Sequence, residues 1–336
     1  MPPMLIDIGV LVFALLLILL AAELFTNGIE WLGHKLQLSE GVVGSVLAAV
    51  GTALPETLIP IVAVTGHSEQ YHDIGIGAIA GAPFMLCTLT MAVCGTAVWA
   101  FSKAGIRTPE LAINKTVLSR DLTFFLIAYS IGLLATLASP TPELRQVIAF
   151  CLLLVYVIYL KKTFAHEGEV GEAPEHLHFE KLKMGRSLAV VILQVLAGLG
   201  GILWGAHQFV DHIHNIAKIV DIPSVILAMI IAPVATELPE KFNSVIWVRA
   251  KKDTLAMGNI TGALVFQSCF PLAFGVAFTK WQLGVGTIIS GIVALCSASI
   301  ILFLIRKDSL KFQHMIFAGL LYAATVGYLL YMHLTD

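Results

Sequence analysis

Ten long apolar stretches follow one another along the chain and are separated by short polar connections. They lie near residues 8–26, 41–65, 75–101, 121–139, 143–160, 187–210, 222–248, 255–279, 283–305 and 312–333. Each is close to the length of about 20 residues that an α-helix needs to cross a bilayer. The pattern therefore predicts an all-α polytopic membrane protein with ten transmembrane helices.

Basic residues are distributed unevenly between the connections. Most of the 20 Lys and Arg residues lie in connections that follow odd-numbered stretches, whereas those after even-numbered stretches hold only Arg145, Lys218 and Lys280. By the positive-inside rule the odd connections are cytoplasmic. We therefore expect a multi-pass protein of the plasma (inner) membrane with both termini outside.

A short sequence in the second stretch recurs in the seventh. Residues 51–57 read GTALPET and residues 235–241 read ATELPEK, and the same offset pairs further apolar positions without a gap. This is an internal repeat, and its copies are an odd number of spans apart, so they cross the membrane in opposite directions. The sequence predicts two inverted five-helix repeats, 1–160 and 187–336, joined by a cytoplasmic linker at 161–186, as in many secondary transporters.

The linker contains the one hydrophilic segment of any length, His166–Lys183, which is rich in His and Glu. We interpret it as a solvated connection. A metal-sensing role for its His and Glu residues is the alternative, and their spacing gives that role no specific support.

Each repeated block places a proline inside an apolar stretch. Pro55 and Pro239 have no N–H to donate to the carbonyl four residues earlier in a helix, which belongs to Gly51 or Ala235. At membrane depth such a carbonyl needs another polar partner, such as a bound cation.

A glutamate follows each proline, and a carboxylate within a span is costly unless it is paired or functional. If the halves meet across a pseudo-two-fold axis, Glu56, Glu240, the hydroxyls of Thr52 and Thr236 and the two carbonyls surround one point. All are oxygen ligands. A hard cation such as Ca²⁺ takes about six to eight oxygens, and two carboxylates balance its charge. The structural alternative, two proline-kinked helices with locally bonded glutamates, is disfavoured by the duplication.

A further pair of segments follows the blocks. Residues 77–82 read GAIAGA and residues 258–263 read GNITGA. Both contain Gly-xxx-Gly, which lets helices approach closely in lipid, and this packing role alone explains the glycines.

Taken together, these blocks resemble the calcium/cation antiporter superfamily, particularly its sodium/calcium exchanger branch. Members pair a Gly-Thr-Ser-Leu-Pro-Glu type block with a later Gly-Asn-x-x-Gly-Ser type block in each half of a ten-span chain, and the resemblance covers essentially the whole sequence. It implies that spans two, three, seven and eight line a central ion site, with Thr52, Glu56, Thr236 and Glu240 at that site. It also implies that spans one and six slide or rock against the other eight.

The chain departs from the family pattern at several ligand positions. Residues of other types stand there in place of hydroxyl, amide or acidic groups, namely Ala53, Ala78, Ala82, Leu86, Glu237, Ala263 and Gln267. Asn259 and Gln267 carry amide oxygens and belong to the candidate ligand set. Because alanine offers no oxygen, coupling to sodium is left open.

Glu237 adds a third acid to the block. It lies three residues before Glu240, so a site with all three carboxylates would hold at least one proton when it contains no cation, which favours proton exchange. Alternatively, Glu237 pairs with Lys241 four residues later and leaves two acids at the site. Both interpretations stay open, and the Lys241 ammonium could occupy part of the cation's place.

Composition supports the membrane assignment and excludes other classes. The 336 residues are 58% apolar and 12% charged, with a mean hydropathy of +0.89, which no soluble domain of this length shows. A net charge of −2 without a basic run gives no indication of a nucleic-acid partner. The five cysteines lack paired spacing, so we expect small core residues rather than disulfides or a zinc site.

These observations predict a secondary-active antiporter that exports Ca²⁺ in exchange for Na⁺ or H⁺ by alternating access. Its partners are the lipid bilayer and inorganic cations, it needs no cofactor, and we expect a monomer. The alternatives are an antiporter for another cation with H⁺ coupling and, less favoured, a cation channel. No span contains a nucleophile with a base or a His-x-x-x-His pair, so an enzyme is not expected.

Overall fold

The computed structural model describes residues 3–36, 54–66, 69–137, 141–164 and 176–335, and within these ranges it contains helices and no strand. The helices are α1 (Pro3–Lys35), α4 (Leu54–Thr65), α5 (Glu69–Met85), the π-helical turn η2 (Leu86–Thr90), α6 (Met91–Lys103), α7 (Lys115–Leu137), α8 (Pro142–Phe164), α9 (His178–Lys181), α10 (Leu188–Val220), α11 (Ser224–Thr236), α12 (Leu238–Arg249), α13 (Asp253–Phe278), α14 (Val285–Arg306) and α15 (Phe312–Thr335). The predicted all-α class is confirmed for this part of the chain.

Eight helical runs in the described part are long and apolar enough to cross a membrane. They coincide with eight of the ten predicted stretches. The other two, 41–65 and 222–248, are those that contain the repeated blocks. Residues 41–53 lie outside the described residues, so only α4 represents the first, and the second is divided into α11 and α12. The count of ten spans stays a prediction.

The division of the seventh stretch corrects the expectation of a proline inside a continuous helix. The backbone leaves helical geometry at Glu237 (φ −92°, ψ 10°), and α12 starts at Leu238 with Pro239 in its first turn. Proline is well tolerated there because the first helical N–H groups have no intrahelical acceptor. The chain therefore breaks the helix before the proline instead of kinking it.

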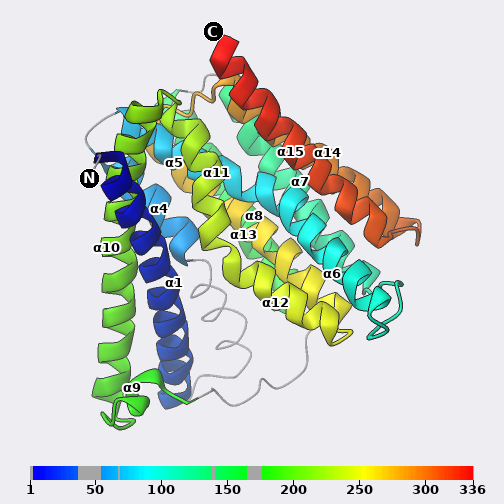
Figure 1. Ribbon diagram of the computed structural model, residues 1–336, viewed down its shortest axis with the longest axis horizontal. Coiled ribbons are helices and arrows are strands. Elements are labelled where there is room, and N and C mark those ends of the chain that lie inside the picture. Colours follow the sequence, from blue (N-terminus) through cyan, green and yellow to red (C-terminus); the bar gives the residue numbers. More distant parts are fainter. Residues whose placement is uncertain (1–2, 37–53, 67–68, 138–140, 165–175, 336) are drawn as a thin grey trace.

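Helices α1 and α10 form a pair at one side of the molecule, and the remaining long helices run obliquely away from them (Figure 1). Both are 33 residues long, and they pack along each other. Of the two larger hydrophobic clusters, one joins this pair to α4 and α11, and the other is centred on α13, packed against α7 and α8. The candidate site lies where α4, α5 and α11 meet.

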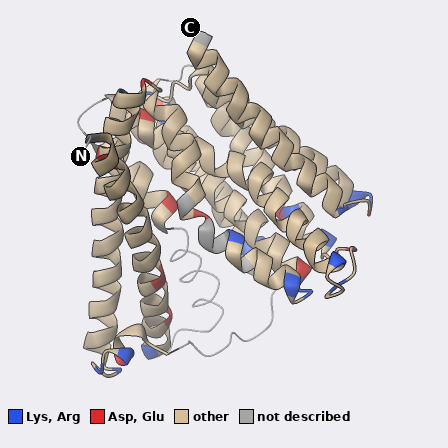
Figure 2. Cartoon of the chain, in the orientation of Figure 1, with Lys and Arg blue, Asp and Glu red and all other residues tan. Residues whose placement is uncertain are grey.

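Lys and Arg residues gather at the helix ends far from the two chain termini (Figure 2). Arg107, in the α6–α7 connection, forms a buried two-point ion pair with Asp253, the first residue of α13. Their Nη1–Oδ1 and Nη2–Oδ2 distances are 2.5 and 2.8 Å. This pair ties the connection to the helix that crosses the core.

The last part of the linker packs against the bundle, which corrects the expectation of a fully solvated connection. Leu177 is buried, and the backbone N–H groups of His178 and Phe179 donate to the side chains of Asn27 on α1 and Gln194 on α10. Residues 165–175 lie outside the described residues.

The cysteines also require a correction. Cys87, Cys94 and Cys269 are buried as expected, but Cys151 and Cys296 are exposed on the outer faces of α8 and α14. In a membrane such faces are apolar, so a cysteine there does not have to be covered by protein.

Candidate cation-binding site

A small cavity of about 10 Å³ lies between α4, α5 and α11. Its lining residues are Glu56, Ile59, Pro60, Ala78, Ala82, Ala232, Pro233 and Thr236. Glu56 and Thr236 are the polar side chains among them, and they are 7% and 3% exposed. The cavity thus brings one predicted ligand from each half of the chain to the same place, and it is about large enough for one water molecule.

The helices approach closely at this cavity because α5 carries glycine where it meets α11. A Cβ atom on Gly77 would lie 2.3 Å from the Val225 carbonyl oxygen, and one on Gly81 would lie 2.2 Å from the carbonyl oxygen of Met229. Such distances exclude any side chain. The predicted packing role of Gly-xxx-Gly is confirmed for this segment.

The equivalent glycines in the second half lie in a different environment. No described residue comes within 4 Å of a Cβ built on Gly258, and for Gly262 the nearest such atom is the Tyr159 hydroxyl at 3.9 Å. Within the described part of the chain, close helix packing therefore does not explain the second Gly-xxx-Gly.

A second polar group lies next to the cavity wall and contains two residues that the sequence analysis singled out, Glu237 and Lys241. Glu237 is fully buried, and its carboxylate accepts a hydrogen bond from the Gln267 amide at 3.5 Å. Lys241 Nζ lies 4.0 Å from the same carboxylate. The structure therefore holds an acid and a base side by side within the bundle.

The Lys241 ammonium also has two contacts beyond Glu237. It donates to the carbonyl oxygen of Pro233 at 3.2 Å and lies 3.0 Å from the sulfur of Met85. Pro233 lines the cavity, so the ammonium sits directly behind the cavity wall. The sequence analysis missed Met85, because a methionine in an apolar stretch carries no signal of such a contact.

The π-helical turn η2 follows Met85 immediately and includes Leu86. Such turns disturb the regular backbone hydrogen bonds of a helix and are frequent at functional sites. Here the Ser297 hydroxyl of α14 donates to the Cys87 carbonyl oxygen at 2.6 Å. No residue pattern in the sequence predicts this turn.

The remaining candidate ligands are placed less completely. Gly51 and Thr52 lie outside the described residues. Ala235 is in α11 and Glu240 in α12, with side chains outside the described set. Asn259 is half-buried in α13. Among the described residues no group of three or more His, Cys, Asp or Glu side chains could hold a metal ion.

One buried acid of the core was not predicted. Asp121 of α7 accepts a hydrogen bond from the Thr261 hydroxyl of α13 at 2.8 Å, and it forms an ion pair with Arg120 at 3.1 Å. Thr261 belongs to the second glycine-containing segment. The sequence could have pointed to Asp121, because it is the first residue of a predicted span and a buried carboxylate there needs partners.

The fold and the buried polar groups define a multi-pass integral membrane protein with ionisable side chains inside its bundle. The chain belongs to the sodium/calcium exchanger protein family, whose model matches residues 6–162 and 190–334. This confirms the resemblance seen in the repeated blocks, and the family consists of transporters, not enzymes.

Two relatives match most of the chain. An uncharacterized membrane protein of Methanocaldococcus jannaschii is 22% identical over 276 residues, which cover 82% of this chain and 83% of that protein. The inner membrane protein YrbG of Escherichia coli is 21% identical over 283 residues, with 83% and 82% covered.

Two solved structures share the fold. The H⁺/Ca²⁺ exchanger CAX superimposes with a TM-score of 0.73 at 17% identity, covering 98% of this chain and 87% of that one. The sodium-calcium exchanger NCX_Mj, soaked with Na⁺ and Sr²⁺, gives a TM-score of 0.59 at 20% identity, with 96% and 98% covered.

Proposed function

We propose that this protein is a secondary-active antiporter that exports Ca²⁺ in exchange for Na⁺ or H⁺. The observation that carries the proposal is the cavity at which Glu56 from the first half and Thr236 from the second half meet. A buried carboxylate beside a hydroxyl suits a hard cation, and the ion is the transported substrate rather than a resident cofactor. Family membership and the exchanger activities named for CAX and NCX_Mj support this assignment.

The two halves of the chain, 1–160 and 187–336, are proposed to be inverted repeats that bring Glu240 to the same ion as Glu56. Their packing supports the symmetry. The contact of α8 with α13 has a counterpart in that of α15 with α6, and the contact of α7 with α13 has one in that of α14 with α5. The remaining ligands in this proposal are Thr52, Asn259, Gln267 and the backbone carbonyls of Gly51 and Ala235.

We further propose that Lys241 balances the charge of Glu237, so that Glu56 and Glu240 carry the charge of the transported ion. The 4.0 Å separation of Lys241 and Glu237 and the absence of Glu237 from the cavity lining support this division. The two carboxylates of Glu56 and Glu240 then balance the charge of a divalent cation. The Lys241 ammonium balances the third carboxylate, that of Glu237.

Alternating access is proposed to come from movement of the α1–α10 pair against the other long helices. The pair packs along its own length and touches the rest mainly through α4 and α11, which also border the cavity. Movement at this contact would open the cavity to one side of the membrane at a time.

Calcium uptake into reconstituted vesicles, driven separately by a Na⁺ gradient and by a pH gradient, tests the function. We expect uptake with at least one gradient and a loss of at least tenfold in Glu56→Gln, which keeps the size of the side chain but removes its charge. Glu143→Gln, the same change at an exposed position of α8, is the control and should transport normally. Normal transport by Glu56→Gln would refute the ligand role.

The alternative of a cation channel uses the same acid and differs in kinetics. A channel conducts without a counter-ion, whereas an antiporter shows saturable uptake that stops when the opposing gradient is removed. Large currents in planar bilayers, without dependence on a second ion, would favour the channel.

A further inference from the structure

Two amide side chains are buried between α1 and α10, at the end of this helix pair that carries α9 (Figure 1). Gln194 of α10 is fully buried, and Asn27 of α1 is 7% exposed. Gln194 Nε2 donates to Asn27 Oδ1 at 2.9 Å and to the Leu24 carbonyl oxygen at 3.0 Å. Amide groups away from water are costly unless they are hydrogen-bonded, so these contacts fix the position of α10 along α1.

The last residues of the linker between the two halves supply further partners for both amides. The backbone N–H of Phe179 donates to Gln194 Oε1 at 2.8 Å, and that of His178 donates to Asn27 Oδ1 at 3.1 Å. The Asn27 amide in turn donates to the His176 carbonyl oxygen at 3.5 Å. Both side chains therefore bind the linker and each other at the same time.

One apolar side chain anchors the linker between the two helices. Leu177 is fully buried in a cluster with Trp31 of α1 and Val191 of α10. The neighbouring His178 places its Nε2 atom 3.4 Å from the Glu23 carboxylate of α1. The linker thus contacts α1 and α10 at once, through backbone groups and side chains alike.

Glycines bring the two helix backbones together at this place. A Cβ atom on Gly28 of α1 would lie 2.9 Å from Val195 Cγ2, and one on Gly198 of α10 would lie 2.7 Å from the Phe25 backbone nitrogen. A shift of one helix by a turn, about 5.4 Å, would put other side chains at these close contacts and break the hydrogen bonds of both amides. The amides and the glycines therefore select one register of α1 against α10.

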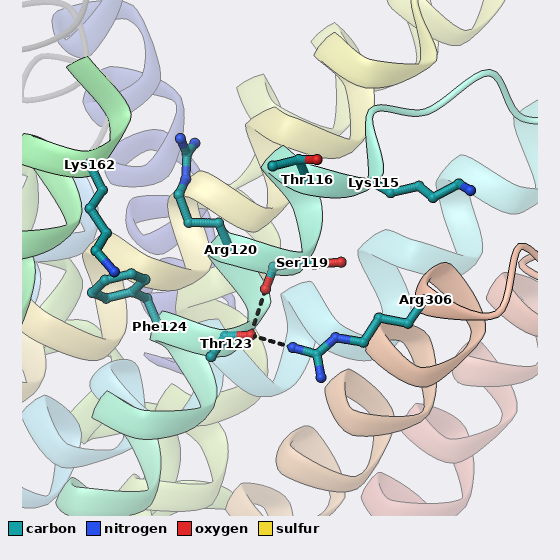
Figure 3. A pocket seen from close by; sticks show the side chains of 8 residues that line it. All are labelled: Lys115, Thr116, Ser119, Arg120, Thr123, Phe124, Lys162 and Arg306. Carbon is teal, nitrogen blue, oxygen red and sulfur yellow. Dashed lines mark hydrogen bonds between the residues drawn. The ribbon is translucent and has the colours of Figure 1, made fainter. Parts of the chain in front are cut away.

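Other long helices are joined by polar contacts of their own. The Arg306 guanidinium of α14 donates to the Thr123 hydroxyl of α7 at 3.2 Å (Figure 3). The Gln146 amide of α8 donates to the Ala277 carbonyl oxygen of α13 at 3.0 Å. Because these contacts join helices outside the α1–α10 pair, they offer a matched control for it.

We propose that Asn27 and Gln194 are positioning residues for transport, and that linker residues 176–179 join them in a clamp that makes α1 and α10 move as one body. Neither amide is among the side chains that line the cavity in the described part of the chain, so both act through the helices and not on the ion. Movement of the pair as a unit keeps every bond of the clamp, whereas sliding of one helix along the other would leave two buried amides unpaired. The inference rests on the alternating access proposed above.

Distances between spin labels test the clamp without a transport assay. Leu20→Cys on α1, Leu196→Cys on α10 and Leu134→Cys on α7 place labels, two at a time, on exposed faces of the full-length chain in nanodiscs. Cys151 and Cys296, which are also exposed, are replaced by serine. The α1–α10 distance should be single and narrow and the same with Ca²⁺ and with EDTA, whereas the α1–α7 distance should change.

Two variants release the clamp from different sides. Asn27→Leu/Gln194→Leu removes both amides at similar side-chain volume, and Leu177→Ser weakens the linker anchor while it keeps both amides. Each should broaden the α1–α10 distance distribution. Gln146→Leu removes an interhelical amide contact outside the pair and should leave this distribution unchanged.

Calcium uptake per folded protein separates positioning from ion binding. Asn27→Leu/Gln194→Leu should keep the KM for Ca²⁺ within about twofold and lower kcat by roughly fivefold or more, because helix movement and not ion contact is impaired. Gln146→Leu should change neither constant.

An α1–α10 distance that differs between Ca²⁺ and EDTA in the native chain would overturn the proposal. An unchanged distribution in both clamp variants, or a raised KM at normal kcat in Asn27→Leu/Gln194→Leu, would overturn it as well. A native chain that takes up no calcium would instead contradict the proposed function, and the spin-label distances would still decide whether the clamp exists.

Discussion

Lys241 is the residue whose chemistry is least expected within a membrane bundle. The residue is 8% exposed, and its ammonium contacts a carbonyl, a thioether and the Glu237 carboxylate. A charged group at this depth is tolerated only when its neighbours replace the hydration it has lost. Glu237 and Lys241 therefore depend on each other, and a change in one has to be judged with the other.

We expect Lys241→Met to lower the free energy of unfolding by about 3 kcal/mol, because it leaves the Glu237 carboxylate buried without its cation. The double variant Glu237→Gln/Lys241→Met, which removes both charges, should recover most of this loss. Thermal unfolding of the purified proteins in one detergent measures both effects. If the loss of stability in the double variant equals the sum of the losses in Glu237→Gln and Lys241→Met, the two residues do not interact.

At the scale of single elements, the approach of α5 to α11 shapes the cavity. Gly81→Ala would place a methyl group 2.2 Å from the Met229 carbonyl oxygen, so the helices must separate. We expect a loss of about 2–3 kcal/mol in stability and reduced calcium uptake. Gly258→Ala is the matched control, because no described atom lies within 4 Å of the added Cβ, and it should be neutral or slightly stabilising. Equal effects of the two changes would argue against the close approach.

The connection between α6 and α7 depends on the ion pair of Arg107 with Asp253. Arg107→Gln should cost about 3–5 kcal/mol, since it removes one partner and leaves the other buried. Arg249→Gln, the same change at an exposed position at the end of α12, should change the unfolding temperature by less than about 2 °C. Unfolding curves of the two variants and the native chain provide the comparison, and a stable Arg107→Gln would show that the pair is dispensable.

The sequence predicts where most helices lie but not where they are interrupted. Span length follows from the apolar runs, so α8, α14 and α15 begin and end within a few residues of the predicted stretches. The break at Glu237 and the π-helical turn at Leu86–Thr90 depend on how neighbouring helices supply hydrogen bonds. Such partners come from distant parts of the chain and leave no local pattern.

The sequence likewise predicts only part of the candidate site. The duplicated Pro-Glu block identified Glu56 and Thr236, which line one cavity, because a costly carboxylate in a span signals function by itself. Met85 lies 156 positions from its partner Lys241, and only the packing of α5 against the second half brings them together. Side-chain contacts of this kind require the three-dimensional register of the helices.

For the whole molecule, the positions of the charges predict its orientation in the membrane. Lys and Arg gather at the ends far from the termini (Figure 2), so those ends should face the cytoplasm and the termini the outside. Lys280 and Lys311 are exposed residues in connections that are predicted to lie on opposite sides of the membrane. Each can be replaced by cysteine in a background in which Cys151 and Cys296, the two exposed native cysteines of the described chain, are serine.

A membrane-impermeant maleimide applied to intact cells should label Lys280→Cys directly. Lys311→Cys should react only after the membrane is permeabilised, because its connection follows an odd-numbered span. The unsubstituted background reports labelling of the buried cysteines and should stay unlabelled. If Lys311→Cys reacts in intact cells and Lys280→Cys does not, the chain has the opposite orientation.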